Sequence, residues 1–277
     1  MKTKKIRWKQ VLLCTFLLLI VFVNIVPLFW MLSSAIKPGT ELFTREIHLI
    51  PYAPTLDNFK TALEDFPFFT WVKNSVGTTA GISLLRIAVS ILTAFALSYY
   101  RTRFNAVVFY MIIATMVVPF QVTMIPNYIL VSKLGLLNTW SAVILPNVAG
   151  ASSFFFLRQH LRGIPRDYFE VGQIEGGNSF WIMRNVVFGM CKGAVSAMFI
   201  LAIIDAWNIY FWPLLVMKDT AAKTLTIGLR NFVDIEMGSR WGEFMATATM
   251  ASLPVIGIYL LMQRNIIDAF IASGLKG

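Results

Sequence analysis

Long apolar stretches alternate with short polar segments along the whole chain. Four stretches contain no charged residue, namely 11–36, 105–132, 134–157 and 244–263, and two more hold one charge each, Arg86 in 74–100 and Asp205 in 193–217. A helix rises about 1.5 Å per residue and the hydrocarbon core of a bilayer is about 30 Å thick, so about 20 apolar residues form one span. The pattern therefore predicts six transmembrane helices, at about 11–36, 74–100, 105–132, 138–157, 193–217 and 244–263.

Two of these segments need a closer definition. The first, with its Lys-rich start and Ser33-x-Ala35, also resembles a signal peptide. Its apolar run exceeds the 7–15 residues of such a peptide, however, so we expect a retained helix. The fourth is diluted at its beginning by Gly135 and Asn138, and we expect that helix to start near Trp140.

Composition supports a membrane protein. Of the 277 residues 57% are hydrophobic and only 14% are charged, and the mean hydropathy is +0.68. An ordinary soluble domain has about 25% charged residues. The two cysteines, Cys14 and Cys191, are isolated and indicate neither a disulfide framework nor a metal site. The predicted fold class is therefore an all-α, polytopic membrane protein.

The distribution of charge predicts the orientation of the helices. If the amino terminus is cytoplasmic, the inner segments hold 14 basic and four acidic residues, whereas the outer segments hold nine of each. The net charge of +10 then lies on one side, as the positive-inside rule requires. We expect both termini to be cytoplasmic, with residues 1–10 as a tail and 11–277 as one transmembrane domain. A pI of about 9.8 can indicate nucleic-acid binding. Here the excess of basic residues is explained by membrane topology, so we expect no nucleic-acid partner.

The inner segment 158–192 is too long for a simple turn. Pro165 suits the first turn of a helix, and Tyr168, Val171 and Ile174 recur three residues apart, which gives one apolar stripe. Residues 176–178, Gly-Gly-Asn, should end that helix, and Ser179 is placed to cap the next. The segment predicts two short cytoplasmic helices joined by a glycine turn.

This segment carries a resemblance. Residues 170–176, Glu-Val-Gly-Gln-Ile-Glu-Gly, resemble the EAA loop of bacterial ABC-importer permeases, with Val171 and Gly172 in place of two alanines. Gly189 stands where that loop usually closes with proline. Further markers resemble the carbohydrate-uptake class, in particular the inner-subunit type of maltose transporters. They are Asn74-Ser75, residues 134–139, 155–159 and 164–168, Trp207-Asn208, residues 212–214 and 224–229, and the carboxyl end from Gln263.

The resemblance implies a type I ABC-importer permease of the bacterial cytoplasmic (inner) membrane that imports a sugar. Such a permease pairs with a second permease subunit, usually a different chain, and works with two copies of a cytoplasmic ATPase and an extracytoplasmic solute-binding protein. The loop around 165–184 would be the coupling segment that docks on the ATPase, with Glu170, Val171, Gly172, Glu175 and Gly176 as candidate coupling residues. Because the chain lacks a G-x-x-x-x-G-K-[ST] sequence, ATP and Mg²⁺ are expected on the partner ATPase, and no cofactor on this chain.

Two intramembrane charges and several polar or aromatic residues are candidates for the solute pathway. Arg86 and Asp205 both lie about 14 residues from the inner face, or about 20 Å. They are expected to form an ion pair between helices, to line an aqueous cavity, or to bind the partner permease. The candidate pathway residues are Asn147, Ser152, Trp207, Asn208 and Tyr210, although Asn147 and Ser152 also suit helix packing, and Tyr210 and Trp212 an aromatic belt.

Other functions remain as alternatives. The chain could import a non-sugar solute through an ABC system, or be a secondary transporter, although no internal repeat is evident. A membrane-embedded enzyme is disfavoured because His48 and His160 lie apart from acids and cysteines, so we expect neither catalytic nor metal-binding residues. The outer segment 37–73 either meets a binding protein or simply connects two helices.

Overall fold

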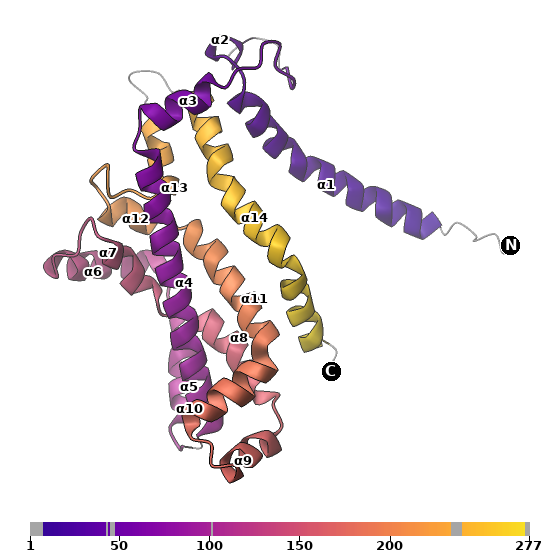
Figure 1. Ribbon diagram of the computed structural model, residues 1–277, viewed down its shortest axis with the longest axis vertical. Coiled ribbons are helices and arrows are strands. Elements are labelled where there is room, and N and C mark those ends of the chain that lie inside the picture. The colour runs from indigo at the N-terminus through magenta and orange to yellow at the C-terminus, as the bar shows by residue number, and fades with distance from the viewer. Residues whose placement is uncertain (1–7, 43, 45–47, 101, 234–239, 275–277) are drawn as a thin grey trace. The chain divides into compact units, whose positions relative to one another are not determined.

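The computed structural model describes residues 8–42, 44, 48–100, 102–233 and 240–274, and the side chains among them up to Gln263. Every regular element in this part of the chain is helical (Figure 1), which confirms the predicted all-α class. Packing within the chain defines two compact units, residues 1–68 with 229–253 and residues 69–228 with 254–277.

Four helices among the described residues are long and apolar enough to cross a membrane: Trp8–Ala35, Phe68–Tyr99, Ser179–Trp207 and Trp241–Gln263. Two bent helix pairs, Asn105–Thr115 with Phe120–Lys133 and Trp140–Asn147 with Ala151–Arg162, raise the number to six if each pair is one span. The predicted six spans therefore correspond to the upper end of a range from four to six.

The first unit contains α1 (Trp8–Ala35), α2 (Gly39–Leu42), α3 (Asp57–Glu64), η3 (Leu229–Phe232) and the first part of α14 (Trp241–Gly274). α1 begins inside the predicted tail 1–10, of which residues 1–7 lie outside the described part. Its side chains are exposed from Trp8 to Phe29, so no described part of this unit covers it. A helix this apolar needs lipid or another subunit around it.

Polar contacts fix the end of this unit that contains α3. The side-chain amide of Asn58 in α3 donates to the carbonyls of Ala35 (2.9 Å) and Lys37 (2.7 Å). Arg240 pairs with Asp65 at 2.8 Å and with Glu243 at 2.9 Å. Burial lowers the pKa of Arg240, but the hydrogen bonds to the two carboxylates outweigh it, and the pKa is raised above its ordinary value.

The second unit is arranged along α4 (Phe68–Tyr99) and α11 (Phe188–Trp207), which contribute to its hydrophobic clusters. One cluster packs the later part of α4 and α11 with α8 (Ala151–Arg162), α10 (Ser179–Ile182) and the π-helical turn η2 (Met183–Val187). The other packs Ile82 of α4 with α6 (Phe120–Lys133), α7 (Trp140–Ile144) and α12 (Phe211–Val216). The remaining elements are α5 (Asn105–Thr115), η1 (Leu145–Asn147), α9 (Arg166–Ile174) and α13 (Leu225–Gly228).

Two glycines let α7 approach α4 closely. A Cβ at Gly77 would lie 2.4 Å from the Trp140 ring, and a Cβ at Gly81 would lie 2.5 Å from Ile144. These glycines are one helical turn apart, so they form a flat strip on α4 of the small-xxx-small kind that brings membrane helices together.

The third predicted helix, 105–132, is not one continuous helix but two. α5 and α6 meet at an angle of 95° across residues 116–119. Pro119 causes the break because it lacks an N–H to continue α5 and disfavours a helical conformation at Val118. The fourth predicted helix is bent too, by 46°, between η1 and α8, where Pro146 and Gly150 interrupt it. Its start at Trp140 is confirmed.

The remaining boundaries also differ. α4 begins at Phe68 rather than 74, and α14 runs from Trp241 to Gly274 rather than 244–263. The fifth helix was predicted at 193–217, but it begins at Ser179 and ends at Trp207, with α12 as a separate helix. Trp212, predicted for an aromatic belt, is 1% exposed and donates through Nε1 to the carbonyl of Ala142 (2.9 Å). Sequence hydropathy cannot separate an interior aromatic residue from one that faces lipid.

Candidate functional site

The inner segment folds as α9, a tight turn and α10. The N–H of Gly177 donates to the carbonyl of Gly172 (2.9 Å), and the N–H of Gly176 donates to that of Gln173 (3.0 Å). These two bonds are the Schellman pattern, and Gly176 has the positive φ, +78°, which that pattern requires. A residue without a Cβ adopts this conformation readily. The predicted glycine turn is confirmed.

The second half of this segment differs from the prediction. Asn178, not Ser179, caps α10, because its side-chain oxygen accepts the N–H of Trp181 (2.8 Å). Ser179 instead lies with its Oγ 2.6 Å from the hydroxyl of Tyr100. α10 is not a separate short helix either, since it continues through η2 into α11. Gly189 keeps its backbone N–H and leaves the helix unbroken.

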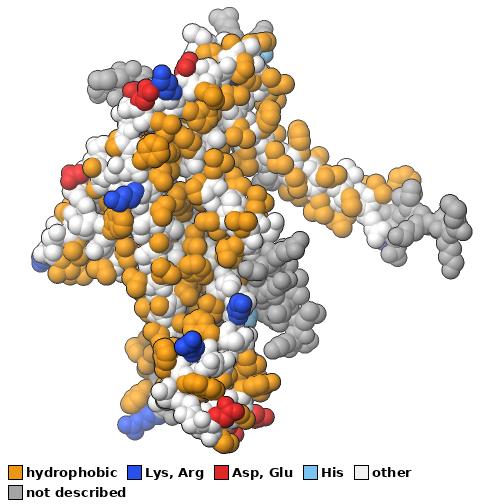
Figure 2. Space-filling view, viewed as in Figure 1, with side chains coloured by type: hydrophobic (Ala, Val, Ile, Leu, Met, Phe, Trp, Pro, Cys, Tyr) orange, Lys and Arg blue, Asp and Glu red, His pale blue; other side chains and the backbone are white. Residues whose placement is uncertain are grey.

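α9 has one face packed and one face open. On the packed face, the ring of Phe169 lies 5.7 Å from that of Tyr99, and the Gln173 amide donates to the Tyr99 hydroxyl at 2.5 Å. On the open face, the predicted stripe of Tyr168, Val171 and Ile174 is exposed, with Ile174 at 85%. At the end of the molecule where Figure 1 places α9, Figure 2 shows acidic side chains beside exposed hydrophobic ones.

The candidate coupling residues divide between these faces. Glu170, Val171, Glu175 and Gly176 are exposed. Gly172 is buried, and a Cβ there would lie 3.3 Å from Ile182 and 3.4 Å from Trp181. Gly172 therefore packs α9 against α10 and is not accessible to a docking partner.

The two intramembrane charges meet. Nη1 of Arg86 in α4 lies 2.5 Å from Oδ2 of Asp205 in α11, and Nε of Arg86 donates to the carbonyl of Asn147 (3.0 Å). The arginine stem crosses Gly150, where a Cβ would lie 2.8 Å from two of its carbons. Of the three arrangements considered for these charges, the structure contains the ion pair, and it joins α4, η1 and α11.

A cavity of about 570 Å³ adjoins Arg86. It lies among α4, α5 and the start of α8, and four hydroxyl-bearing residues line it, Ser90, Thr93, Thr115 and Ser152. Arg86 is the one ionisable residue in the lining. Its partner Asp205 keeps 65% of its side chain exposed. A carboxylate this exposed at mid-span cannot face hydrocarbon, so its side of α11 must border water or another protein.

The other predicted pathway residues do not line this cavity. Trp207 is 6% exposed, and Asn208 caps α11 by donating to the carbonyl of Ile204 (2.7 Å). Tyr210 packs edge-on against Phe211. Because α11 ends at Trp207, residues 208–210 are not helical and form no helical face with Trp207. Of the five candidates, Ser152 lines the cavity and Asn147 holds Arg86.

A polar network at the start of α4 was not predicted. The Asn74 amide donates to three successive carbonyls, Ala221 (2.8 Å), Ala222 (3.0 Å) and Lys223 (2.9 Å), while its oxygen accepts from Trp140 Nε1 (2.9 Å). Ser75 Oγ accepts the N–H of Leu225 (2.8 Å). The sequence contains a signal, because Asn74-Ser75 and 224–229 are both markers of the family resemblance, but their separation of about 150 residues gives no indication of contact.

Comparisons with known proteins agree with this architecture. Residues 86–271 match the model of the family described as binding-protein-dependent transport system inner membrane component. The chain belongs to this family. It is therefore a multi-pass permease of the inner membrane and a subunit of a binding-protein-dependent ABC importer, in which a separate subunit is the ATPase. This membership excludes the secondary transporter and the enzyme.

Individual relatives span nearly the whole permease. It is 30% identical over 261 residues to the arabinooligosaccharides transport system permease protein AraQ of Halalkalibacterium halodurans, covering 93% of each chain. It is 29% identical to the sn-glycerol-3-phosphate transport system permease protein UgpE of Rhizobium meliloti, covering 93% of this chain and 95% of the relative. A bacterial ABC transporter that imports the acidic polysaccharide alginate has the same fold, with a TM-score of 0.85, 22% identity, and coverage of 95% and 99%.

Proposed function

We propose that this permease forms half of the translocation pathway for an uncharged sugar or oligosaccharide. The observation that carries the proposal is the cavity beside Arg86, whose one charged lining residue is neutralised by Asp205. Hydroxyl groups make up much of the remaining polar lining, and they both donate and accept hydrogen bonds, as sugar hydroxyls do.

Charge distinguishes among the solutes of the relatives. A phosphate ester or an acidic polysaccharide would need unpaired cationic groups along its path, because a buried anion without a partner is costly. Arg86 does not supply such a group while it pairs with Asp205. An uncharged solute, of the kind named for the arabinooligosaccharide relative, fits the balanced cavity better than glycerol 3-phosphate or alginate.

A second permease subunit would complete the pathway. The exposed side of Asp205 needs water or protein beside it at mid-span depth. If this side of α11 lies between the two permeases, the partner permease supplies the protein, and a pathway between the two chains supplies the water. By the family resemblance, that partner is a different chain, so the importer contains a heterodimer of permeases.

The open face of α9 is the proposed coupling surface for the cytoplasmic ATPase. An apolar stripe that this chain leaves uncovered, beside Glu170 and Glu175, suits a partner cleft with apolar and basic lining. Gly176 fixes the end of α9 by its positive φ, so the stripe has a defined direction. Closure of the ATPase would then move α9. Through α10 and η2, that movement would reach α11, the helix that carries Asp205.

Reconstitution tests the solute class. The permease is assembled with its partner permease, ATPase and solute-binding protein in proteoliposomes, and ATP hydrolysis is measured with arabinooligosaccharide, other uncharged sugars or glycerol 3-phosphate. We expect an uncharged sugar to stimulate hydrolysis. Replacing Asp205 by Asn should weaken that response, whereas Ser252→Ala, outside the cavity, should not. Stimulation by anionic solutes alone would contradict the proposal.

A further inference from the structure

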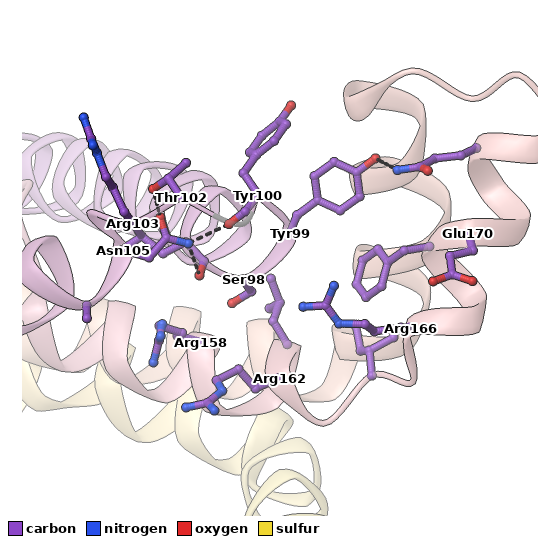
Figure 3. A pocket seen from close by; sticks show the side chains of 16 residues that line it. Ser98, Tyr99, Tyr100, Thr102, Arg103, Asn105, Arg158, Arg162, Arg166 and Glu170 are labelled. Carbon is purple, nitrogen blue, oxygen red and sulfur yellow. Dashed lines mark hydrogen bonds between the residues drawn. The ribbon is translucent and has the colours of Figure 1, made fainter.

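A second cavity, of about 670 Å³, lies at the other end of the same helices (Figure 3). Its walls are the carboxyl end of α4, α8, α9 and, between α4 and α5 and at the start of α5, Tyr100, Thr102, Arg103, Asn105 and Ala106. Figure 3 shows Arg158, Arg162 and Arg166 along one side and Ser98 and Asn105 along the other. The lining of this second cavity shares no residue with the lining of the cavity beside Arg86.

The lining of this cavity is strongly cationic. It contains four arginines, Arg103, Arg158, Arg162 and Arg166, and one acid, Glu170. Within the part of the chain that the structure describes, none of these arginines has an ion pair. Arg158 and Arg162 are four residues apart on α8, so they share a face and repel each other. A bound anion would relieve this repulsion.

Arg158 also has an unmet hydrogen bond. Its side chain is partly buried, with the guanidinium 4.1 Å from the centre of the Phe109 ring. Its Nε is shielded from solvent and has no acceptor among the described residues. The side chain is thus held in place, on an aromatic face, with its other nitrogens available to an anion. A planar guanidinium in this state suits a phosphate, which it binds with two parallel hydrogen bonds.

The surroundings indicate which phosphate. Tyr99 ends α4 and Tyr100 follows it, and aromatic residues at the ends of spanning helices are typical of the boundary between hydrocarbon and water. From this boundary, Phe104, which precedes α5, and Val107 and Met111 in α5 present exposed apolar side chains at one-turn spacing. A headgroup in the cavity would therefore have a continuous apolar surface beside it for acyl chains. The positive-inside distribution assigns this boundary to the cytoplasmic leaflet.

We propose that this cavity binds the phosphate of an anionic lipid headgroup, such as that of phosphatidylglycerol, with the acyl chains along the exposed face of α5. Basic pockets between membrane helices on the cytoplasmic side commonly hold such headgroups. The lipid bridges α8 and α9 through Arg158, Arg162 and Arg166, and so supports the packed face of the hairpin whose open face is free. This site is independent of the solute that the importer carries.

The test uses the complete purified importer, incubated in detergent with phosphatidylglycerol or phosphatidylcholine and analysed for bound lipid by native mass spectrometry. We expect phosphatidylglycerol to be retained and phosphatidylcholine to be lost. The double variant Arg158→Gln/Arg162→Gln should retain about 30-fold less phosphatidylglycerol, given the usual contribution of each basic residue near an anionic surface. Arg158→Lys/Arg162→Lys, which keeps both charges, should retain most of it.

Lys192→Gln is the matched control, because Lys192 is an exposed inner-side cation outside the cavity. Equal retention in the double glutamine variant and in this control would overturn the site. If the double variant does not assemble, two other measurements test the site. They are phosphatidylglycerol retention by Arg166→Gln, which should fall below that of the control, and competition by inorganic phosphate in the unaltered importer. Displacement of the lipid by millimolar inorganic phosphate would identify free phosphate as the ligand and overturn the lipid assignment. Retention of the lipid in the presence of inorganic phosphate supports the lipid assignment.

Discussion

At the scale of single residues, Arg86 combines three contacts that no other side chain could replace together. It pairs with Asp205, donates to the Asn147 carbonyl, and passes over the bare backbone of Gly150. The first contact is electrostatic, the second depends on the position of Nε, and the third depends on the absence of a Cβ. The pair is therefore anchored at the arginine and open at the aspartate.

This asymmetry predicts the behaviour of charge variants. Arg86→Met should leave an unpaired carboxylate at mid-span and lose most transport, at a cost of about 1–3 kcal/mol for the missing partner. Combining it with Asp205→Asn should restore part of the activity, because no unpaired charge remains. Exchanging the two charges should restore less, since an aspartate carboxylate at 86 has no N–H to donate to the Asn147 carbonyl. Uptake assays on the three variants measure this, and full rescue by exchange would contradict the anchored geometry.

Gly176 offers a second test at this scale. Gly176→Leu places a Cβ at a φ of +78°, which costs about 1–2 kcal/mol for most residues. Apart from the adjacent residues of the chain, no atom lies within 4 Å of that Cβ, so the membrane domain should still fold. We expect normal amounts of protein in the membrane but loss of solute-stimulated ATP hydrolysis.

Gly176→Asn is the control, because asparagine tolerates the left-handed region. It should retain coupling. Normal uptake by Gly176→Leu would count against α9 as the coupling element.

At the scale of elements, the sequence predicted what depends on composition and local chemistry. Apolar runs predicted the helices, and Gly-Gly-Asn predicted the turn after α9. Hydropathy missed the bends because Pro119 and Gly150 lie within apolar runs that look continuous. It also missed the glycine strip of Gly77 and Gly81, whose partner Trp140 is remote in sequence. Contacts between distant segments, such as Arg86 with Asn147, depend on tertiary packing and have no local signal.

The open face of α9 predicts an effect on assembly without an effect on folding. Ile174 is 85% exposed, so Ile174→Glu should leave the stability of the permease within about 0.5 kcal/mol. If this face docks on the ATPase, the charge should be buried against the partner and reduce co-purification of the ATPase strongly. Ile174→Leu keeps an apolar side chain and should retain the complex. Undiminished co-purification of Ile174→Glu would show that the ATPase docks elsewhere.

At the scale of the whole molecule, the charge distribution and the helical hairpin give one orientation. The inner side holds the excess of basic residues, α9 and the arginine cavity, and the opposite ends of the helices hold the Asn74 network. A coupling surface, a headgroup site and the positive-inside rule all require the same side to be cytoplasmic. An inverted topology would contradict all three together.

Site-directed labelling tests this orientation directly. In a background with Cys14→Ser and Cys191→Ser, a single cysteine is introduced in place of Arg103, an exposed residue after α4, or of Asp219, an exposed residue after α12. A membrane-impermeant maleimide should label the variant at 219 in intact cells, and the variant at 103 only after the cytoplasmic membrane is opened. The reason is that Asp219 lies on the side with balanced charge, where a solute-binding protein would meet the importer, whereas Arg103 belongs to the basic side. Labelling at 103 in intact cells would reverse the orientation, and with it the assignment of α9 to the ATPase.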